Sequence, residues 1–251
     1  MRFKDQVVLI TGASSGIGED SARAFAEEGA HVFLVARRTE KGETVAQSIR
    51  DAGGSATFFK ADMGNRKEIE AMVNACIATY GRLDVAFNNA GIEGDFFVET
   101  HKHSEEAWDD LLAINLTGVW YCMRHQIPHM LKQGKGAIVN MASMAGVKGF
   151  AGSSGYAASK FGVVGITKAA ALEYATQGVR VNCVCPAVIR SEMAEKIFLQ
   201  TEESAAGTAA SHPMGRIGEP REVSNAVMWL ASDEASFITG EALQIDGGLG
   251  A

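Results

Sequence analysis

The segment QVVLITGASSGIG, Gln6–Gly18, joins a short apolar run to a glycine-rich turn, and a helical pattern follows to about Gly29. Glycines let a backbone turn tightly and approach a pyrophosphate, while the next helix offers unpaired N–H groups and its positive end. No Lys-Ser or Lys-Thr pair follows Gly18, so the segment is not a P-loop. We interpret it as a strand, a phosphate-binding turn and a helix, with a glycine-rich turn that binds nothing as the alternative.

The rest of the chain repeats this alternation of apolar runs and segments with helical spacing. Because each predicted strand is nearly all apolar, the pattern indicates a doubly wound parallel sheet with helices on both faces. No linker or repeat interrupts it, so residues 1–251 are expected to form a single α/β domain. Strands are predicted over residues 6–10, 31–36, 55–62, 83–91, 136–142, 179–185 and 241–246. A helix is predicted from the end of the glycine turn at residue 18 to about residue 29. Further helices are predicted over residues 40–52, 67–79 and 104–131, and from residues 156 and 220. Residues 186–219 are expected to be irregular.

Composition excludes several classes of protein. With 47% hydrophobic and 21% charged residues the chain reads as globular, and its net charge of −7 argues against nucleic-acid binding. No apolar run approaches the ~18 residues of a membrane span, and the first residues lack a long apolar signal core, so no membrane association and a cytoplasmic location are expected. The four cysteines form no CxxC pair and no histidines cluster near them, so we expect small core residues and no metal site.

The residues after the second predicted strand bear on the cofactor. In a dinucleotide-binding sheet an acidic residue there accepts from the 2′-hydroxyl of NAD, whereas an arginine accommodates the 2′-phosphate of NADP. This chain has Arg37 and Arg38, which favours NADP(H) and leaves NAD(H) open; two solvated surface charges are the alternative. Ser15 stands where a second basic residue would strengthen a phosphate site. Asp62, after the third strand, either bonds the adenine amino group or caps the next helix.

The segment SMAGVKGFAGSSGYAASK, Ser143–Lys160, brings together a hydroxyl, a phenol and an amine. On a helix, Tyr156 and Lys160 share one face, and an ammonium beside a phenol favours the phenolate. We therefore expect Lys160 to lower the pKa of Tyr156 from ~10 toward the working range, so that Tyr156 can serve as acid or base. Ser143 is the candidate to hold the oxygen that Tyr156 protonates, with Ser153 and Ser154 as less favoured rivals. A packing tyrosine and a solvated lysine are the alternative.

Taken together, these motifs resemble the classical short-chain dehydrogenase/reductase family. The match runs from about Val7 to Gly248 and includes TGASSGIG, Asn88-Asn89-Ala90-Gly91 and Pro186. The resemblance implies a seven-stranded Rossmann sheet and a homo-oligomer, a tetramer or a dimer. It also implies a catalytic tetrad of Asn115, Ser143, Tyr156 and Lys160. The cofactor-binding residues expected from the motifs and the resemblance are Gly12, Ser14, Ser15, Gly16, Ile17, Gly18, Arg37, Arg38, Asp62, Met63, Asn89, Ala90, Gly91, Tyr156, Lys160, Pro186, Ile189 and Ser191.

The resemblance also assigns roles within that set. Lys160 would bond the nicotinamide ribose hydroxyls, and Asn115 would hold a water in a proton relay. The stretch Asn88–Gly91 would support the central strand near the adenosine. Where the family has a Pro-Gly turn and a nicotinamide-binding threonine, this chain has Pro186-Ala187 and Ser191. Ala187 lacks the freedom of glycine, whereas Ser191 keeps the hydroxyl, so we expect the contact to be retained.

The function expected from these residues is hydride transfer between NADP(H) and a ketone or secondary alcohol of moderate size, which is aliphatic, aromatic or steroid-like. Residues 192–212 are partly amphipathic and are a candidate substrate lid. Residues that could line an apolar pocket, or could equally belong to the core or an interface, are Met144, Val147, Phe150, Met193, Ile197 and Phe198, with Glu93, Phe96 and Phe97 opposite. Subunit contacts are expected from residues 221–232 and 242–251.

Three other functions stay open. A 3-oxoacyl carrier-protein reductase would need a basic patch to meet an acidic carrier, for which Lys148, Arg190, Arg216 and Arg221 are candidates. A sugar dehydrogenase is not distinguished by the C-terminal half of the chain. A cofactor-sensing binding protein would keep the fold without turnover, although it would have no need for Tyr156 and Lys160 together.

Overall fold

Seven parallel strands form one sheet in the order β3-β2-β1-β4-β5-β6-β7. The computed structural model describes all residues from 1 to 251. The strands are β1 (Val7–Thr11), β2 (His31–Ala36), β3 (Ser55–Lys60), β4 (Val85–Asn88), β5 (Gly136–Met141), β6 (Val179–Pro186) and β7 (Ala242–Ile245). The sheet confirms the predicted α/β Rossmann architecture, and its order reverses between β1 and β4, the place where such sheets bind ligands.

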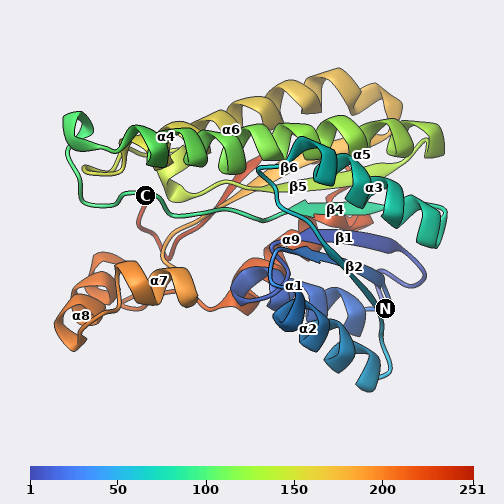
Figure 1. Cartoon of the computed structure of the whole chain (residues 1–251), viewed down its shortest axis with the longest axis horizontal. Helices are drawn as coiled ribbons and strands as arrows, with labels where there is room; N and C mark the ends of the chain where they lie inside the picture. The colour runs from blue at the N-terminus through green and yellow to red at the C-terminus, as the bar shows by residue number, and fades with distance from the viewer.

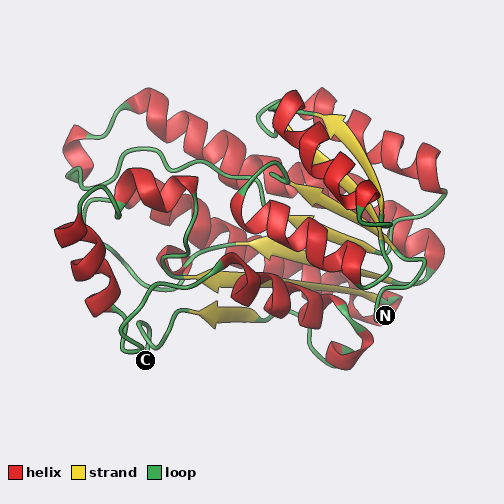
Figure 2. Cartoon of the chain, turned by 90° about the horizontal axis from the view of Figure 1, so that it is seen from below, coloured by secondary structure: helices red, strands yellow, loops and turns green.

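Helices cover both faces of the sheet (Figures 1 and 2). One layer contains α1 (Gly16–Glu27), α2 (Thr39–Asp51) and α9 (Pro220–Ala231). The other contains α3 (Arg66–Tyr80), α4 (Glu105–Leu111), α5 (Val119–Gln133) and α6 (Ser154–Tyr174). No helix combines the length and the apolar character that crossing a bilayer requires.

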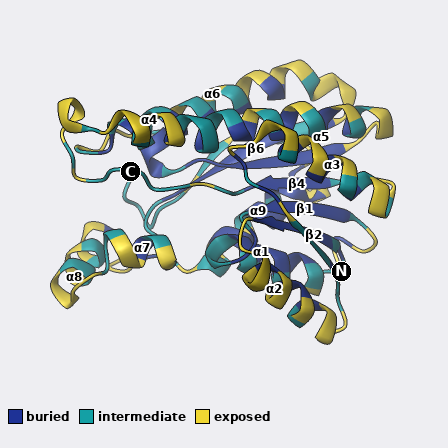
Figure 3. Ribbon diagram, viewed as in Figure 1, coloured by how far each residue is buried: buried dark blue, intermediate teal, exposed yellow.

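Strand residues alternate between the two layers, because successive side chains of a strand point to opposite faces. On β1, Val8 and Ile10 pack with Phe25 of α1, whereas Val7 and Leu9 pack with Met72 of α3. Both faces are buried, which explains the continuous apolar runs in the sequence (Figure 3). All four cysteines are free and buried, as predicted.

A polar network crosses the apolar core between β4, β5 and the helices above them. Asn88 Nδ2 donates to Gln126 Oε1 at 3.1 Å and to Asn140 Oδ1 at 2.9 Å, and Gln126 Nε2 donates back to Asn88 Oδ1 at 2.8 Å. Asn140 Nδ2 in turn donates to Thr167 Oγ1 at 2.9 Å. Because each amide has partners, the network ties two strands to α5 and α6 without leaving a buried amide group unpaired.

Residues 186–219 are not irregular throughout, so that expectation was wrong. They contain α7 (Glu192–Ile197) and α8 (Glu202–Ser211), which lie outside both helical layers (Figure 1). Local capping explains both helices: Ser191 accepts a hydrogen bond from the Ala194 amide, and Thr201 and Ser204 form a reciprocal capping box. Only Ala194 is buried in α7 and no residue is buried in α8. Helices with so little buried surface need no regular apolar spacing, so the sequence pattern does not predict them.

The predicted helix over residues 104–131 is made of three segments. Between α4 and α5 lies a π-helical segment, η2 (Leu112–Gly118), and α5 extends to Gln133. A π-helical turn takes in one extra residue while the axis continues, so sequence periodicity alone does not reveal it. The insertion carries Asn115, which belongs to the site described below.

Candidate active site

The glycine turn after β1 is shaped by three glycines whose conformation or surroundings exclude a side chain. Gly12 and Gly16 have φ values of 69° and 56°. A Cβ on Gly18 would lie 2.3 Å from the Gly12 carbonyl oxygen, so the N-terminus of α1 can approach the turn only with glycine there. Asn89 Nδ2 donates to the Thr11 carbonyl at 2.9 Å, and this bond joins the ends of β1 and β4.

One cavity of about 1010 Å³ runs along the carboxyl ends of the strands. It brings together every predicted site residue except Asn115. The turn residues Gly12, Ser14, Ser15, Gly16, Ile17 and Gly18, then Arg37, Arg38, Asp62, Met63, Asn89, Ala90 and Gly91, and finally Ser143, Tyr156, Lys160, Pro186, Ile189 and Ser191 all line it. A nucleotide-sized ligand fits this volume, and the anion-binding turn lies at its wall.

Tyr156 and Lys160 share one face of α6, as the spacing predicted. The Lys160 Nζ lies 5.5 Å from the centroid of the Tyr156 ring and donates to the Met141 carbonyl at 3.0 Å. Lys160 is only 2% exposed, and burial lowers its pKa to about 8. The amine thus lies beneath the phenol, attached to the end of β5.

The expectation that Lys160 lowers the pKa of Tyr156 was wrong. Burial raises the pKa of Tyr156 to about 12, the nearby Ser143 hydroxyl lowers it, and the negative charge of Glu93 raises it further. The Lys160 amine donates to the Met141 carbonyl and not to the phenol, so desolvation decides the pKa of Tyr156. Tyr156 therefore keeps its proton at neutral pH.

Ser143 lies beside Tyr156 in the cavity, as expected of the hydroxyl that would hold a substrate oxygen. It follows β5, its Oγ accepts from the Ala145 amide at 3.1 Å, and its side chain lies near the Tyr156 phenol. Ser153 is buried and donates to the Phe150 carbonyl at 2.9 Å, so its hydroxyl is already engaged. Of these two hydroxyls, Ser143 is the one available to a substrate oxygen.

Asn115 stands behind the cavity wall and is fully buried. Its Oδ1 accepts from the Ile92 amide at 2.8 Å, and its Nδ2 donates to the Ile92 carbonyl at 2.9 Å. A Cβ on Gly91 would lie 3.2 Å from Asn115 Oδ1 and 3.5 Å from Lys160 Nζ. The π-helical insertion thus places Asn115 against the same backbone segment that Lys160 approaches.

The end of the cavity beside β2 is basic and hydroxyl-rich. Arg38 donates from Nε and Nη2 to Ser14 Oγ at 3.2 and 3.1 Å, and from Nη2 to Ser15 Oγ at 2.6 Å. Arg37 Nη1 lies 3.9 Å from Asp62 Oδ2. These side chains could hold a phosphate group on an adenosine ribose.

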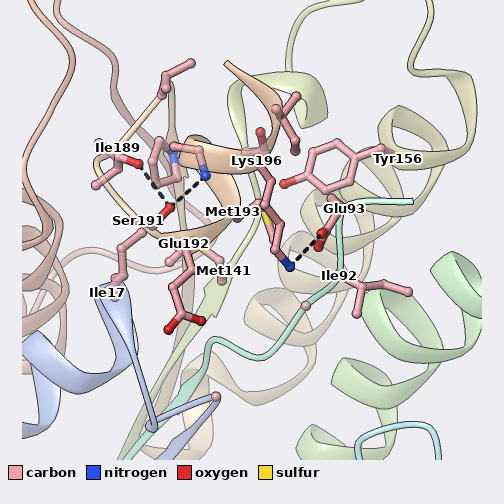
Figure 4. A pocket seen from close by; sticks show the side chains of 18 of the residues that line it. Ile17, Ile92, Glu93, Met141, Tyr156, Ile189, Ser191, Glu192, Met193 and Lys196 are labelled. Carbon is pink, nitrogen blue, oxygen red and sulfur yellow. Dashed lines mark hydrogen bonds and ion pairs between the residues drawn. The ribbon is translucent and has the colours of Figure 1, made fainter. Parts of the chain in front are cut away.

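Asp62 does not cap the helix that follows it, so that alternative is excluded. Asn65 caps α3 by accepting from the Lys67 amide, whereas Asp62 Oδ1 accepts from the Gly64 amide at 2.9 Å. Ser191 caps α7 and also donates to the Ile189 carbonyl at 3.1 Å (Figure 4). The hydroxyl expected at a nicotinamide therefore has local partners in this structure.

An aromatic wall stands beside Tyr156. The Phe96 ring lies 5.1 Å from the Tyr156 ring and 5.8 Å from the Phe198 ring, and Phe97 lies 5.9 Å from Phe198, between centroids. Of the residues expected around an apolar pocket, Val147 is the exception, because it packs against the core instead. The others do line the cavity, namely Glu93, Phe96, Phe97, Met144, Phe150, Met193, Ile197 and Phe198.

Sequence reasoning missed three charged residues here: Glu192 and Lys196, which line the cavity, and Lys41, which binds Glu192. Glu192 accepts from Lys41 Nζ at 2.6 Å and from Arg38 Nη1 at 2.7 Å, and Lys196 Nζ lies 3.7 Å from Glu93 Oε1. These pairs join segments far apart in the chain, so no local spacing could reveal them. No group of three or more His, Cys, Asp or Glu side chains is placed to hold a metal ion.

Comparisons with known proteins agree with the geometry. A family model described as enoyl-(acyl carrier protein) reductase matches residues 12–250. A cyclohexanol dehydrogenase of Acinetobacter sp. (strain SE19) is 42% identical over 246 residues, which cover 98% of this chain and 95% of that protein. A 3-oxoacyl-[acyl-carrier-protein] reductase, FabG, of Thermotoga maritima is 41% identical over 250 residues, 99% of each. A solved variant of actinorhodin polyketide ketoreductase with NADPH has a TM-score of 0.94 and 40% identity, covering 98% of this chain and 97% of that chain.

Proposed function

The chain belongs to the classical short-chain dehydrogenase/reductase family of oxidoreductases, and from this premise we propose that it transfers a hydride between NADP(H) and a ketone or its secondary alcohol. The observation that carries the proposal is the meeting of Ser143, Tyr156 and Lys160 in the cavity that also holds the glycine turn. When bound, the nicotinamide supplies the hydride and accepts it in the reverse direction.

The chain's own residues position the substrate and move the proton. In the reducing direction Tyr156 protonates the carbonyl oxygen, which Ser143 orients by a hydrogen bond. The buried Lys160, which lines the cavity, would bond the nicotinamide ribose, and Asn115 holds the backbone at Ile92. The raised pKa of Tyr156 supports this direction, because the phenol stays protonated at neutral pH.

NADP(H) is the proposed cofactor because of the charge at the adenosine end of the cavity. Arg37 and Arg38 line it, and Ser14 and Ser15 add hydroxyls that a phosphate can use. No carboxylate stands directly after β2, where an NAD-binding sheet would place one to accept from the ribose 2′-hydroxyl. The NADPH of the ketoreductase structure described above is consistent with this choice.

For the substrate we propose an apolar ketone that carries a ring. The phenyl rings of Phe96, Phe97 and Phe198 form a wall beside Tyr156, and flat apolar faces pack well against a ring. A dehydrogenase of cyclohexanol among the relatives supports this class. Such a wall offers few partners to the many hydroxyls of a sugar, which makes a sugar substrate the weaker alternative.

The α7–α8 segment, within residues 192–212, is proposed as the lid over this substrate. Met193 and Ile197 of α7 line the cavity, and little of either helix is buried in the domain. Segments with few buried contacts open at low cost, as a substrate lid must.

Reduction of a carrier-bound 3-oxoacyl group is the second candidate, favoured by the relative from Thermotoga maritima. It ranks below the ketone because three of the four basic residues proposed to meet an acidic carrier are already paired, and only Lys148 forms no ion pair. Arg190 binds Glu219, Arg216 binds Glu222, and Arg221 binds Asp20 and Glu27. Neutralised in this way, they leave little free positive charge to attract an acidic partner.

The proposal is tested by following the nicotinamide absorbance with NADPH and NADH. The substrates are cyclohexanones, aryl ketones, steroid ketones and an acetoacetyl thioester, and the oxidising direction is tested with cyclohexanols and sugars. Turnover with NADPH and a ring ketone is the expected result. A preference for the thioester would favour the carrier-protein reaction, and tight NADPH binding without any turnover would favour a cofactor sensor.

A further inference from the structure

A carboxylate from the proposed lid reaches into the basic end of the cavity. Glu192, the first residue of α7, accepts from Arg38 Nη1 at 2.7 Å through Oε2 and from Lys41 Nζ at 2.6 Å through Oε1. Arg38 belongs to the link between β2 and α2, and Lys41 lies in α2. This contact therefore joins residues 151 and 154 positions apart in sequence.

The two ends of α7 point to different parts of the cavity. Glu192 points away from Tyr156 and toward the N-terminal part of the chain, whereas Lys196 points to Glu93 beside Tyr156 (Figure 4). The carboxylate of Glu192 thus lies on the cofactor side, and the rest of the helix lies on the substrate side.

Arg38 has no free nitrogen left in this arrangement. Its Nε and Nη2 are used by Ser14 and Ser15, and its Nη1 is used by Glu192. Glu192 is the only carboxylate paired with Arg38, at 2.7 Å from Nη1. These contacts use four of the five N–H groups of the guanidinium, so a phosphate that binds it through two N–H groups must displace a hydroxyl or the carboxylate.

We propose that Glu192 is a specificity-determining residue that competes with the ribose 2′-phosphate of NADP(H) for Arg38 and Lys41, and so reduces the preference for NADP(H) over NAD(H). The inference rests on the proposed function, because it presumes a nicotinamide dinucleotide in this cavity. A phosphate and a carboxylate on one guanidinium repel each other at close range. The neutral 2′-hydroxyl of NAD(H) meets no such repulsion.

The competition concerns only the adenosine end, so it can be measured without turnover. Isothermal titration calorimetry with 2′,5′-ADP and with 5′-ADP isolates the effect of the 2′-phosphate. The same titrations with NADPH and NADH extend it to the whole cofactor. Each ligand is titrated into the wild-type protein, Glu192→Gln and Glu195→Gln. Glu195 is the matched control, because it is exposed on the same helix and forms no ion pair.

We expect Glu192→Gln to bind 2′,5′-ADP and NADPH about three- to fivefold more tightly, the upper part of the range that one exposed carboxylate exerts. Its affinities for 5′-ADP and NADH should stay within twofold of wild type, and Glu195→Gln should change none of the four. The gain should shrink in high salt, because the competing charges are exposed and are screened.

Three results would count against the inference. An unchanged affinity of Glu192→Gln for the 2′-phosphorylated ligands would overturn it, as would an equal change for both ligand classes. A weaker affinity for NADPH would mean that Glu192 assists the cofactor instead of competing with it. If the wild-type protein bound none of the four ligands, the proposed function itself would fail, which is distinguishable from failure of the role of Glu192 alone.

Discussion

Burial acts in opposite directions on the two ionisable side chains of α6 that face the cavity. It raises the pKa of Tyr156 to about 12 and lowers that of Lys160 to about 8. Both effects have one cause, since a charged form loses hydration when protein surrounds it. Near pH 7 the phenol is therefore neutral and the amine mostly charged, which suits donation of a proton from Tyr156 to a carbonyl oxygen.

Replacing the phenol separates chemistry from binding. Tyr156→Phe removes the proton donor and keeps the ring, so we expect kcat for ketone reduction to fall at least about a thousandfold. The affinity for NADPH, measured by titration, should change less than threefold. Tyr80→Phe is the control, because the Tyr80 hydroxyl bonds Thr57 away from the cavity. Near-normal turnover by Tyr156→Phe would remove Tyr156 from the proposed mechanism.

The buried amine should be a liability for stability in the cofactor-free protein. Below pH ~8 both folded and unfolded chains carry the charge, so the cost of burying it is fully present. Between pH ~8 and ~10.5 the unfolded chain binds more protons than the folded one, and this cost is relieved as pH rises. Lys160→Met should therefore raise the free energy of unfolding at pH 7 by about 2 kcal/mol, after the lost bond to the Met141 carbonyl.

Urea unfolding of both proteins at pH 7 and pH 9.5 measures this effect as a difference, because other groups titrate equally in the two chains. The advantage of Lys160→Met should shrink at the higher pH. Lys168→Met is the control, since Lys168 is an exposed cation on the same helix. A stability difference that does not change with pH would show that the buried charge is not its cause.

At the scale of elements, α7 and the residue after it connect the cavity to its proposed lid. Phe198 packs its ring edge-on against Phe96 and Phe97, so it is expected to contact a ring substrate directly. Phe198→Ala should raise KM for a ring ketone about tenfold with kcat changed less than threefold, because apolar contact is lost equally in ground and transition states. The neighbouring Leu199→Ala lies outside the main cavity and should leave KM within twofold. Equal effects of the two changes would argue against the aromatic wall as the substrate surface.

The network around Asn88 should matter for stability more than its small size suggests. Asn88→Leu would leave the buried side-chain amide of Gln126 and the Oδ1 of Asn140 without partners, which costs about 2–4 kcal/mol in unfolding free energy. Asn74→Leu on the exposed face of α3 is the control and should change stability by less than about 0.5 kcal/mol. Urea denaturation of the two variants gives both values, and a small loss for Asn88→Leu would mean that the network is not cooperative.

At the scale of the whole molecule, the apolar residues that could form subunit contacts differ in exposure. Those of α9 that face the sheet, such as Val223 and Val227, are buried in the chain's own core, and the contact expected from the outer face of this helix stays a prediction. Other large apolar side chains stay exposed, among them Phe161 and Leu172 along one stripe of α6, and Phe237. Exposed apolar side chains that gather on one face are typical of a surface that packs against another molecule.

We therefore expect a dimer or a tetramer of the 26.6 kDa chain, as the family resemblance implied. Light scattering coupled to gel filtration measures the mass directly. The double change Phe161→Glu and Leu172→Glu should lower it, because it places charge on the apolar stripe of α6. Thr44→Glu, on the exposed face of α2, should not. A wild-type mass of one chain would contradict the expectation.

Much of this protein follows from local sequence. The apolar runs predict the strands, most directly the five inner ones, since strands buried on both faces must be nearly all apolar. The glycines of the turn at residues 12–18 predict its shape, and the spacing of Tyr156 and Lys160 predicts their shared face, because backbone geometry alone decides both. These features depend on residues within a few positions of one another.

Tertiary structure decided what depends on residues far apart in the chain. The pKa of Tyr156 depends on how much protein surrounds it, and the partners of Arg38 include Glu192, 154 positions away. The π-helical insertion at Asn115 and the two helices of the proposed lid gave no clear periodic signal, because an inserted residue preserves the helix axis and exposed helices need no apolar stripe. The sequence by itself determined the sheet, the glycine turn and most of the groups that face the cavity. Only the folded chain decided their charge states and the ion pairs at the two ends of the cavity, because desolvation and Coulomb interactions depend on distance in space and not on distance along the chain.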